Sequence, residues 1–342
     1  MRIIYFIFSL FVSFSVLAEE KVLNVYNWSN YMPDNIIAQF EKETGIHVNY
    51  STYSSNDELY AKLKAAPNAG YDIVVPTNYF VRRMADQNML LKLNKSQLTN
   101  YKNLNPSLLN KNFDPENQYS IPYFWGSTGI VVNKSYINPN EVQHFSDLWN
   151  SKFYNKLLIL DDTRDVFAMA LIASGYSAND KDPAHIEQAY LKLKQLLPNV
   201  KLFNTDAVKV NYIDEDAVIG LGYSGDTYQA WLENPNLVYI YPKDGFVVWI
   251  DSLTIPRNAP HVANAFKFIN FLLRPDIAKK LSIQMGYATP NLAALKLMPE
   301  NLRNNPIIYP DAKTLERGQF ESSPGNLDSL YEKYMEQLKI SA

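Results

Sequence analysis

The feature that most constrains this chain is an alternation of strand-like runs and helical segments in its first quarter. Strands are expected at residues 23–26, 47–53 and 72–75, and helices at 34–43 and 55–65 lie between them. Helices inserted between successive strands favour a mostly parallel sheet that is covered by helices.

Local signals mark the ends of these helices. Pro33 stands near the start of the first helix and Gly45 follows its end, which is the usual asymmetry of helix termini. Ser55 and Glu58 have the three-residue spacing of a capping box at the start of the second helix.

The same alternation returns in the second half of the chain. Strands are expected at residues 157–160 and 217–221, and helices from Asp162 and at 184–196 and 226–232. A long apolar stretch at 246–255 is followed by two helices, one on each side of Pro275, and by an amphipathic helix at 327–340. A chain of 342 residues has room for two domains of ordinary size. No linker rich in Pro and Gly separates the halves, so we expect two α/β lobes joined by strands that cross between them.

Composition excludes several classes of function. The formal charge of −3 argues against a general nucleic-acid binder, which needs a basic face. The absence of cysteine excludes disulfides, thiolate catalysis and cysteine-bound zinc. The four histidines have no metal-ligand spacing, so we predict no metal site and no cofactor.

The N-terminus has the pattern of a secretory signal peptide. Arg2 precedes an apolar run at residues 3–17, and small residues lead into Glu19 and Glu20. We predict cleavage after Ala18 and a periplasmic location. An uncleaved anchor is the alternative, but the apolar run is short for a membrane span.

Asp162 and Asp165 stand where a strand turns into a helix. One interpretation is capping, with Asp162 at the N-cap and Asp165 three residues later. The other is ligand binding, because strand-to-helix loops at the carboxyl edge of a sheet are common binding positions. The two interpretations are compatible.

Trp249 and Asp251 alternate within an apolar stretch and should therefore project from the same face of a strand. A buried, ionised Asp251 needs a partner. The partner is either a buried arginine or backbone amide, or a ligand ammonium stacked on the Trp249 ring. The sequence leaves both open.

Aromatic and hydroxyl side chains follow two predicted strands. Trp28, Ser29 and Tyr31 follow the first, and Thr77 and Tyr79 follow a later one. Such rings often serve packing between lobes, but their position in loops at strand ends also suits a binding cleft.

Residues 220–225 match the pattern G-x-G-x-x-G of a dinucleotide-binding loop. No clear strand–helix–strand unit frames the match, so we favour a tight turn that presents Tyr223 and Asp226 to a cleft. A nucleophile elbow is not supported. Paired carboxylates of a glycoside hydrolase remain the best enzymatic alternative.

Taken in order, several segments resemble the periplasmic spermidine/putrescine-binding proteins of bacterial ABC transporters. The resemblance runs through nearly the whole chain after the signal peptide. It rests on residues 26–28, 40–45, 50–53, 119–122, 251–253, 268–275 and 289–294.

The resemblance implies a type II periplasmic binding protein fold, α/β, with two lobes that each hold a mostly parallel sheet and a ligand cleft between them. It assigns residues 19–127 and 251–295 to the N-terminal lobe and 128–250 and 296–342 to the C-terminal lobe. It further implies a non-enzymatic monomer that works with an inner-membrane ABC permease.

The resemblance also implies the roles of the site residues. The rings of an aromatic box would be Trp28, Tyr31, Tyr79, Tyr223, Trp249 and Tyr287. Carboxylates facing the ligand nitrogens would be Asp162, Asp165 and Asp251, with hydroxyl contacts from Ser29 and Thr77.

Three positions depart from the spermidine-preferring pattern. Tyr223 stands where a Trp is expected and Glu321 where a Gln is expected, and Asp226 resembles a position used by putrescine-preferring members. The preferred polyamine is therefore open. The alternatives are a secreted carboxylate-dependent hydrolase and a binding protein for another small cation or an amino acid.

Overall fold

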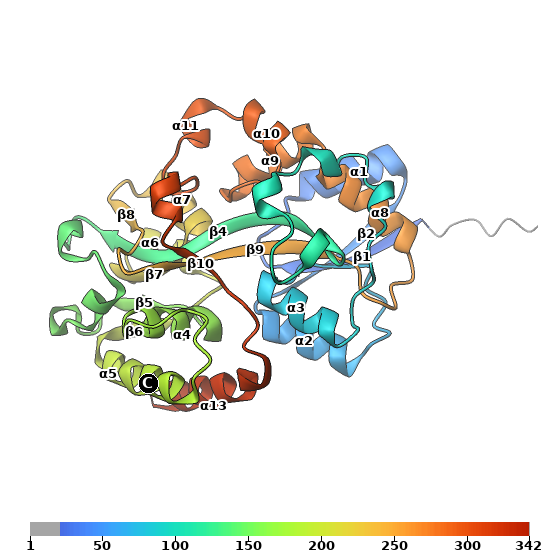
Figure 1. The fold of residues 1–342 in the computed structure, drawn as a ribbon. Helices are drawn as coiled ribbons and strands as arrows, with labels where there is room; N and C mark the ends of the chain where they lie inside the picture. Colours follow the sequence, from blue (N-terminus) through green and yellow to red (C-terminus); the bar gives the residue numbers. More distant parts are fainter. Residues whose placement is uncertain (1–20, 342) are drawn as a thin grey trace, which may run out of the picture.

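The computed structural model describes residues 21–341. The predicted signal peptide and its cleavage after Ala18 lie outside this range. Figure 1 shows the N-terminal part of the chain and the middle part as two α/β lobes, with long strands running between them. Within residues 21–341, no helix is both long and apolar enough to span a membrane.

The first lobe is built on three parallel strands, with β1 between β2 and β3. Its elements are β1 (Val22–Trp28), α1 (Asp34–Thr44), β2 (His47–Tyr53), α2 (Asn56–Ala65), β3 (Ile73–Val74) and α3 (Asn78–Asp86). The predicted strands and the first two helices are present, with ends shifted by one or two residues. Helix α3 was not predicted, and Tyr79 lies in its first turn instead of the expected loop.

The second lobe repeats this plan, with β5 between β6 and β7 in parallel. Its elements are β5 (Leu157–Ile159), α4 (Thr163–Ile172), α5 (Pro183–Leu196), β6 (Val200–Phe203), α6 (Val208–Ile213), β7 (Ile219–Tyr223), α7 (Ser224–Glu233) and β8 (Leu237–Ile240). Strand β6 was not predicted, because it has only four residues and these are partly exposed.

Two long antiparallel strands join the lobes. They are β4 (Ser120–Asn133) and β9 (Phe246–Thr254). In the described residues, the strand order β2-β1-β3-β9-β4-β7-β5-β6 forms one continuous sheet. The prediction that the chain crosses between lobes on strands is thereby confirmed. The proposed lobe boundaries at residues 127 and 250 fall inside β4 and β9, and the division itself stays a prediction.

The last part of the chain returns to both lobes. Its elements are α8 (Val262–Leu272), α9 (Pro275–Met285), α10 (Leu292–Leu297), α11 (Glu300–Arg303), α12 (Ala312–Leu315), β10 (Gly318–Phe320) and α13 (Asp328–Ile340). Phe268 of α8 packs on Phe40 of α1 with 4.8 Å between ring centroids. Tyr331 of α13 packs on Phe167 of α4 at 5.1 Å.

The predicted helix-end signals are seen in the structure. Gly45 has a φ of +69°, the left-handed conformation that favours glycine after a helix. The Ser55 hydroxyl accepts from the Glu58 backbone N–H at 3.1 Å. The Glu58 carboxylate instead accepts from the backbone N–H of Ser54 at 2.9 Å, one residue before the expected position.

Candidate ligand-binding site

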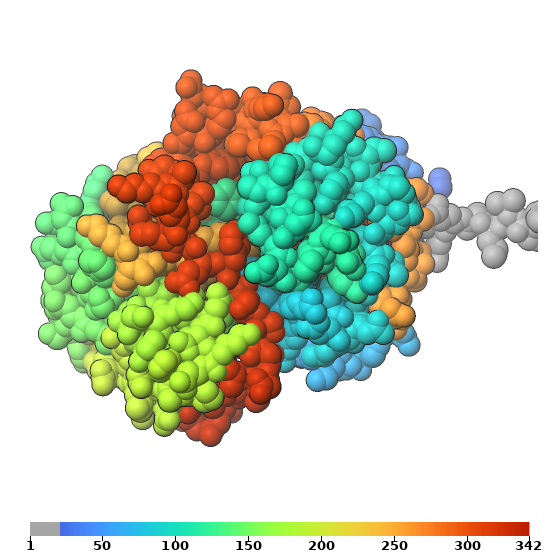
Figure 2. All heavy atoms as spheres, viewed as in Figure 1, coloured from blue at the N-terminus to red at the C-terminus, as the bar shows by residue number. Residues whose placement is uncertain are grey.

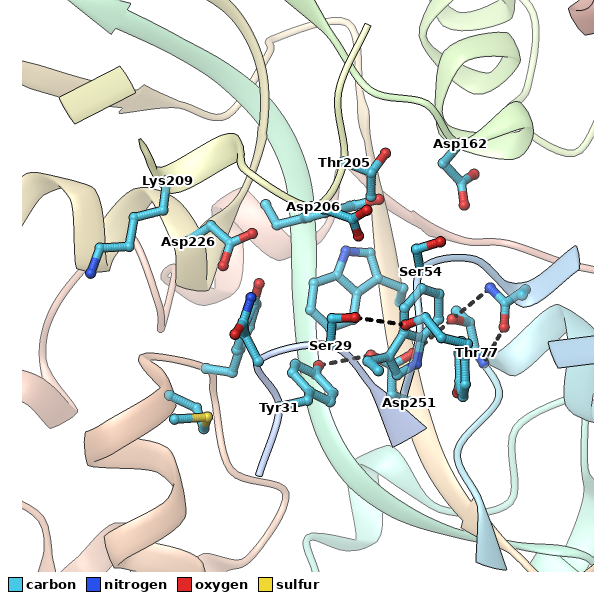
Figure 3. Close-up of a pocket in the computed structure, with 18 of the residues that line it drawn as sticks. Ser29, Tyr31, Ser54, Thr77, Asp162, Thr205, Asp206, Lys209, Asp226 and Asp251 are labelled. Carbon is cyan, nitrogen blue, oxygen red and sulfur yellow. Dashed lines mark hydrogen bonds between the residues drawn. The ribbon is translucent and has the colours of Figure 1, made fainter. Parts of the chain in front are cut away.

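A cavity of about 410 Å³ lies between the two lobes. In Figure 3, Asp162, Asp206 and Asp226 approach it from one side, and Tyr31, Thr77 and Asp251 approach it from the facing side. All of the predicted site residues line it: Trp28, Ser29, Tyr31, Thr77, Tyr79, Asp162, Asp165, Tyr223, Asp226, Trp249, Asp251, Tyr287 and Glu321. Their contact with a ligand stays a prediction.

Trp28 and Tyr53 form one aromatic wall of the cavity at the ends of β1 and β2. The Trp28 indole N–H donates to the Val75 carbonyl oxygen at 2.8 Å, and the Tyr53 hydroxyl donates to the same oxygen at 2.6 Å. The ring centroids are 4.9 Å apart. A single backbone oxygen after β3 therefore orients both rings.

Asp251 lies in β9 and is 6% exposed. The Tyr31 hydroxyl donates to its Oδ2 at 2.8 Å, and the Thr77 hydroxyl donates to its Oδ1 at 2.7 Å. Asn56 in turn holds Thr77, donating from Nδ2 to its hydroxyl at 3.0 Å. The protein partners of Asp251 are thus two hydroxyl groups, and neither an arginine nor a backbone amide.

Burial raises the pKa of Asp251 to about 6, and the hydrogen bonds from Thr77 and Tyr31 oppose this rise. Hydrogen bonds to an ionised carboxylate stabilise its charge. The two hydroxyl groups therefore stabilise the negative form of Asp251 at its buried position.

Trp249 projects from the same face of β9 as Asp251 and belongs to a cluster of four aromatic rings. Tyr223 and Tyr287 meet Trp249 edge to face, with centroid distances of 5.8 and 5.6 Å. Tyr31 meets Tyr287 at 5.2 Å. The Trp249 indole N–H is buried without a hydrogen-bond partner.

Close backbone packing explains the glycine-rich run at residues 220–225. A Cβ at Gly225 would lie 2.3 Å from the Tyr287 ring, so only glycine leaves room for that ring beside the cavity. Gly220 has a φ of +151°, and a Cβ there would lie 2.0 Å from the Leu158 carbonyl oxygen. These close approaches explain Gly220 and Gly225 without a bound dinucleotide.

Asp162 combines capping with a position on the cavity wall. Its Oδ1 accepts from the backbone N–H groups of Arg164 and Asp165 at 2.9 and 3.1 Å. The N-cap prediction is confirmed. The Asp165 side chain lines the cavity, and its Oδ1 is buried without a partner. Burial, together with the nearby carboxylates of Asp162 and Glu321, raises the pKa of Asp165 well above its usual range.

Asp226 lies in the first turn of α7, as the helix dipole favours. Burial raises its pKa to about 6, against the opposing effects of the Tyr287 hydroxyl and the Lys209 ammonium. Lys209 Nζ is paired with Glu233 Oε1 at 2.8 Å. Among the cavity-lining residues that the structure describes, the one cationic group that can balance Asp226 is thus already shared with another carboxylate.

Glu321 follows β10 and is 3% exposed. Its Oε1 is buried without a partner. Burial raises its pKa to about 7, with Arg164 lowering and Asp162 raising it further. Its backbone carbonyl accepts from the Asn78 side-chain amide of α3.

Several lining residues were not predicted. Thr205 and Asp206 lie between β6 and α6, Lys209 lies in the first turn of α6, and Asn56 comes from α2. Recognition of β6 would have marked the residues after it as another strand-to-helix connection at the sheet edge. Nothing in the sequence marks Asn56 as the residue that holds Thr77.

Charge in the cavity wall is strongly unequal. Among residues 21–341, one cationic side chain lines the cavity, Lys209, against six carboxylates: Asp162, Asp165, Asp206, Asp226, Asp251 and Glu321. Aromatic faces attract cations, and carboxylates bind ammonium groups through charge-assisted hydrogen bonds. The arrangement suits a small organic cation with apolar segments between its charges.

A cleft of this kind between two α/β lobes defines a protein that encloses a small solute. The chain belongs to the bacterial extracellular solute-binding proteins, whose family model matches residues 35–309. The predicted fold class and the family resemblance are confirmed.

The chain is similar to two named periplasmic proteins. It is 45% identical over 322 residues to the spermidine/putrescine-binding periplasmic protein of Salmonella typhimurium, covering 94% of this chain and 92% of that protein. It is 34% identical over 317 residues to the putrescine-binding periplasmic protein PotF of Escherichia coli, covering 87% and 85%.

Solved structures show the same architecture. A chain named for a spermidine/putrescine ABC transporter of Listeria monocytogenes matches with a TM-score of 0.91 at 36% identity, covering 94% of this chain and 100% of that one. The substrate-binding protein PotD of Streptococcus pneumoniae matches with a TM-score of 0.79 at 36% identity, covering 94% and 99%.

Proposed function

We propose that this protein captures a polyamine, spermidine or putrescine, in the cleft between its lobes and delivers it to an inner-membrane ABC permease. The observation that carries the proposal is the cavity wall of six carboxylates and one lysine, set among aromatic rings. Similarity to polyamine-binding periplasmic proteins supports it. The ligand leaves chemically unchanged, as expected for a family of solute-binding proteins.

Each class of side chain has a role in this proposal. The aromatic rings pack along the methylene groups and face the ammonium groups, where a cation–π contact contributes about 0.5–2 kcal/mol. The carboxylates of Asp162, Asp165, Asp226, Asp251 and Glu321 receive the ammonium groups, and the hydroxyls of Ser29 and Thr77 complete the contacts. Several carboxylates are needed, because a lone one does not offset the desolvation of an ammonium ion.

The proposal includes the cellular context. The chain is exported by the signal peptide cleaved after Ala18, works in the periplasm as a monomer, and closes its lobes over the ligand. The names of the relatives as periplasmic proteins support this location. The closed, loaded form is the state that the permease would recognise.

Calorimetric titration of the mature protein with putrescine, cadaverine, spermidine and spermine tests the proposal. We expect saturable binding of at least one polyamine and an increase in melting temperature, because a ligand at 100 times its Kd stabilises the folded state by about 2.7 kcal/mol. Absence of heat and of thermal stabilisation with all four would overturn it. Turnover of glycosides would support the hydrolase alternative instead.

A further inference from the structure

Two carboxyl groups in the cavity wall each have a buried oxygen that accepts no hydrogen bond from the residues that the structure describes. They are Oδ1 of Asp165 and Oε1 of Glu321, in side chains that are 6% and 3% exposed. Both residues line the same cavity. An unsatisfied buried carboxyl oxygen is costly, so a donor from an occupant of the cavity would stabilise both oxygens. The hydroxyls of Thr128 and Tyr223 offset part of this cost at Asp165, because they lower its pKa.

The segment that carries Glu321 is held from both lobes. The Asn78 side chain of α3 donates to the Glu321 carbonyl oxygen, and its Oδ1 accepts from the Ile250 N–H at 3.2 Å. On the other side, Asn179 accepts from the Ser322 N–H at 2.7 Å and donates to the Phe320 carbonyl at 2.9 Å. Figure 2 shows the red C-terminal segment lying across the junction of the lobes on this face. Hydrogen bonds from these two asparagine side chains to the backbone around Glu321 therefore hold this residue at the cavity.

The charged neighbours do not balance the two carboxyl groups. Arg164 of α4 is buried, but its Nε and Nη1 have no partner and its Nη2 donates to the Ala178 carbonyl oxygen at 3.2 Å. Its guanidinium carbon lies 4.8 Å from the Tyr331 ring centroid and 5.9 Å from that of Tyr79.

The titratable groups that act on Glu321 come from three helices. Arg164 stabilises the negative charge, and Asp162 opposes it from the start of α4. The hydroxyls of Tyr79 on α3 and Tyr331 on α13 are near enough to interact with Glu321 but remain protonated, since burial raises the pKa of each. One cation thus faces the three carboxyl groups of Asp162, Asp165 and Glu321.

Like charges that are buried close together do not all ionise. Burial raises the pKa of Glu321 to about 7 and, with Asp162 and Glu321, that of Asp165 well above its usual range. A positive group between these two carboxyl groups lowers the pKa of each, because it stabilises both in their ionised forms. The two orphan oxygens would then accept its N–H groups.

We propose that Asp165 and Glu321 together form the seat for one ammonium group of the ligand, hold a proton while the cleft is empty, and release that proton when the ligand binds. The proposal rests on the proposed function, since it needs a cationic ligand. It makes Glu321 a residue that couples affinity for the polyamine to pH.

The sign of the coupling follows from the direction of proton movement. Release of a proton on binding means that affinity rises with pH up to the pKa of the empty site and is level above it. For one group with a pKa near 7 in the empty site and below 6 in the complex, affinity increases about tenfold between pH 6 and pH 8. The ligand ammonium groups, like a lysine at about 10.4, stay largely protonated in this range.

Titration of the mature protein with putrescine in phosphate and in Tris at pH 7 measures the proton directly. The two buffers differ in their heat of ionisation, so the difference in binding heat gives the number of protons released. We expect net release for the wild type and a clearly smaller release in Glu321→Gln, together with a shallower affinity profile from pH 6 to 8. Asp165→Asn is a second variant with the same expected decrease.

Glu316→Gln is the matched control, since it makes the same chemical change at an exposed position five residues earlier. It should release protons as the wild type does. Polyamine binding without proton release in the wild type, or release that is undiminished in both Glu321→Gln and Asp165→Asn, overturns this inference and leaves the proposed function standing. Failure of the wild type to bind any polyamine overturns both.

Discussion

The carboxyl group of Asp251 and the pair formed by Asp165 and Glu321 line the same cavity but are prepared in opposite ways. Asp251 accepts two hydrogen bonds from protein hydroxyls, at 2.8 and 2.7 Å. Asp165 and Glu321 each keep an oxygen without a partner. The first site is arranged for a charge before a ligand arrives, whereas the second relies on the ligand to complete it.

This difference separates two contributions to binding. A preorganised carboxylate adds affinity, because its orientation and charge are already established. An unsatisfied pair lowers the stability of the empty protein, and the ligand relieves that loss when it binds. Burial raises the pKa of both Asp251 and Glu321, so ionisation lowers the stability of the ligand-free protein at both places. The two places differ because Asp251→Asn also weakens two hydrogen bonds from protein hydroxyls, whereas no hydrogen bond to Glu321 Oε1 is present in the described residues.

Asp251→Asn should have the largest effect on binding. Removal of the charge leaves a ligand ammonium buried opposite a neutral amide, which costs about 3–4 kcal/mol, or about 100- to 1,000-fold in affinity. Calorimetric titration with spermidine and putrescine measures it. Asp86→Asn, at an exposed position paired with Arg82, is the control that should bind normally. Unchanged affinity in Asp251→Asn would remove Asp251 from the site.

Glu321→Gln should stabilise the empty protein at alkaline pH. The pKa of Glu321 is about 7 when folded, above the ordinary value of 4.5, so the unfolded chain ionises first and stability falls as pH rises from about 4.5 to 7. A glutamine at position 321 does not ionise, so it does not cause this loss of stability. The free energy of unfolding of Glu321→Gln, relative to that of the wild type, should increase by about 2–3 kcal/mol between pH 5 and pH 8.

Denaturant unfolding of both proteins without ligand, at the two pH values, checks this expectation. Glu316→Gln serves again as the control and should follow the wild type. If the wild type and Glu321→Gln lose stability in parallel between pH 5 and pH 8, Glu321 ionises freely and the contrast with Asp251 fails.

Tyr31→Phe should have the smallest effect of the three. It removes one of the two hydroxyl donors to Asp251, and a hydrogen bond to a charged group contributes about 1.5–3 kcal/mol, so affinity should fall about tenfold at the lower end of this range. The pKa of Asp251 should rise, because the Tyr31 hydroxyl lowers it. Binding measured from pH 5 to 8 should therefore weaken most at the acid end.

Tyr136→Phe is the control for that experiment, since its hydroxyl contacts Glu215 on an exposed surface. Equal affinity of Tyr31→Phe and Tyr136→Phe at every pH would mean that Asp251 does not depend on the Tyr31 donor. The preorganisation argued for this carboxylate would then be wrong.

Regular patterns made much of the fold predictable. Residues 47–53 form β2 over the predicted range, and Asp162 caps α4 as its spacing indicated. In contrast, β4 was not predicted, although it has 14 residues. It is buried on both faces and contains Pro122, Gly126 and Gly129, so it shows neither alternation nor a clean apolar run.

Predictions of the site depended on different information. Asp251 and Trp249 could be placed together from strand periodicity alone. That Tyr31 and Thr77 would supply the partners of Asp251 could not, because these contacts span 220 and 174 residues of sequence. The orphan oxygens of Asp165 and Glu321 are likewise invisible in a sequence, since a missing partner is a property of packing.

The strand β9 joins the two lobes and also forms part of the cavity wall. It runs through the sheet that joins the lobes, and Trp249 and Asp251 project from it into the cavity. Any change in the angle between the lobes must bend or twist this ribbon, or its partner β4, within a few residues of those side chains. A ligand that contacts Trp249 and Asp251 would therefore act directly on a strand that joins the two lobes, and no intervening residues would be needed to couple ligand binding to the angle between the lobes.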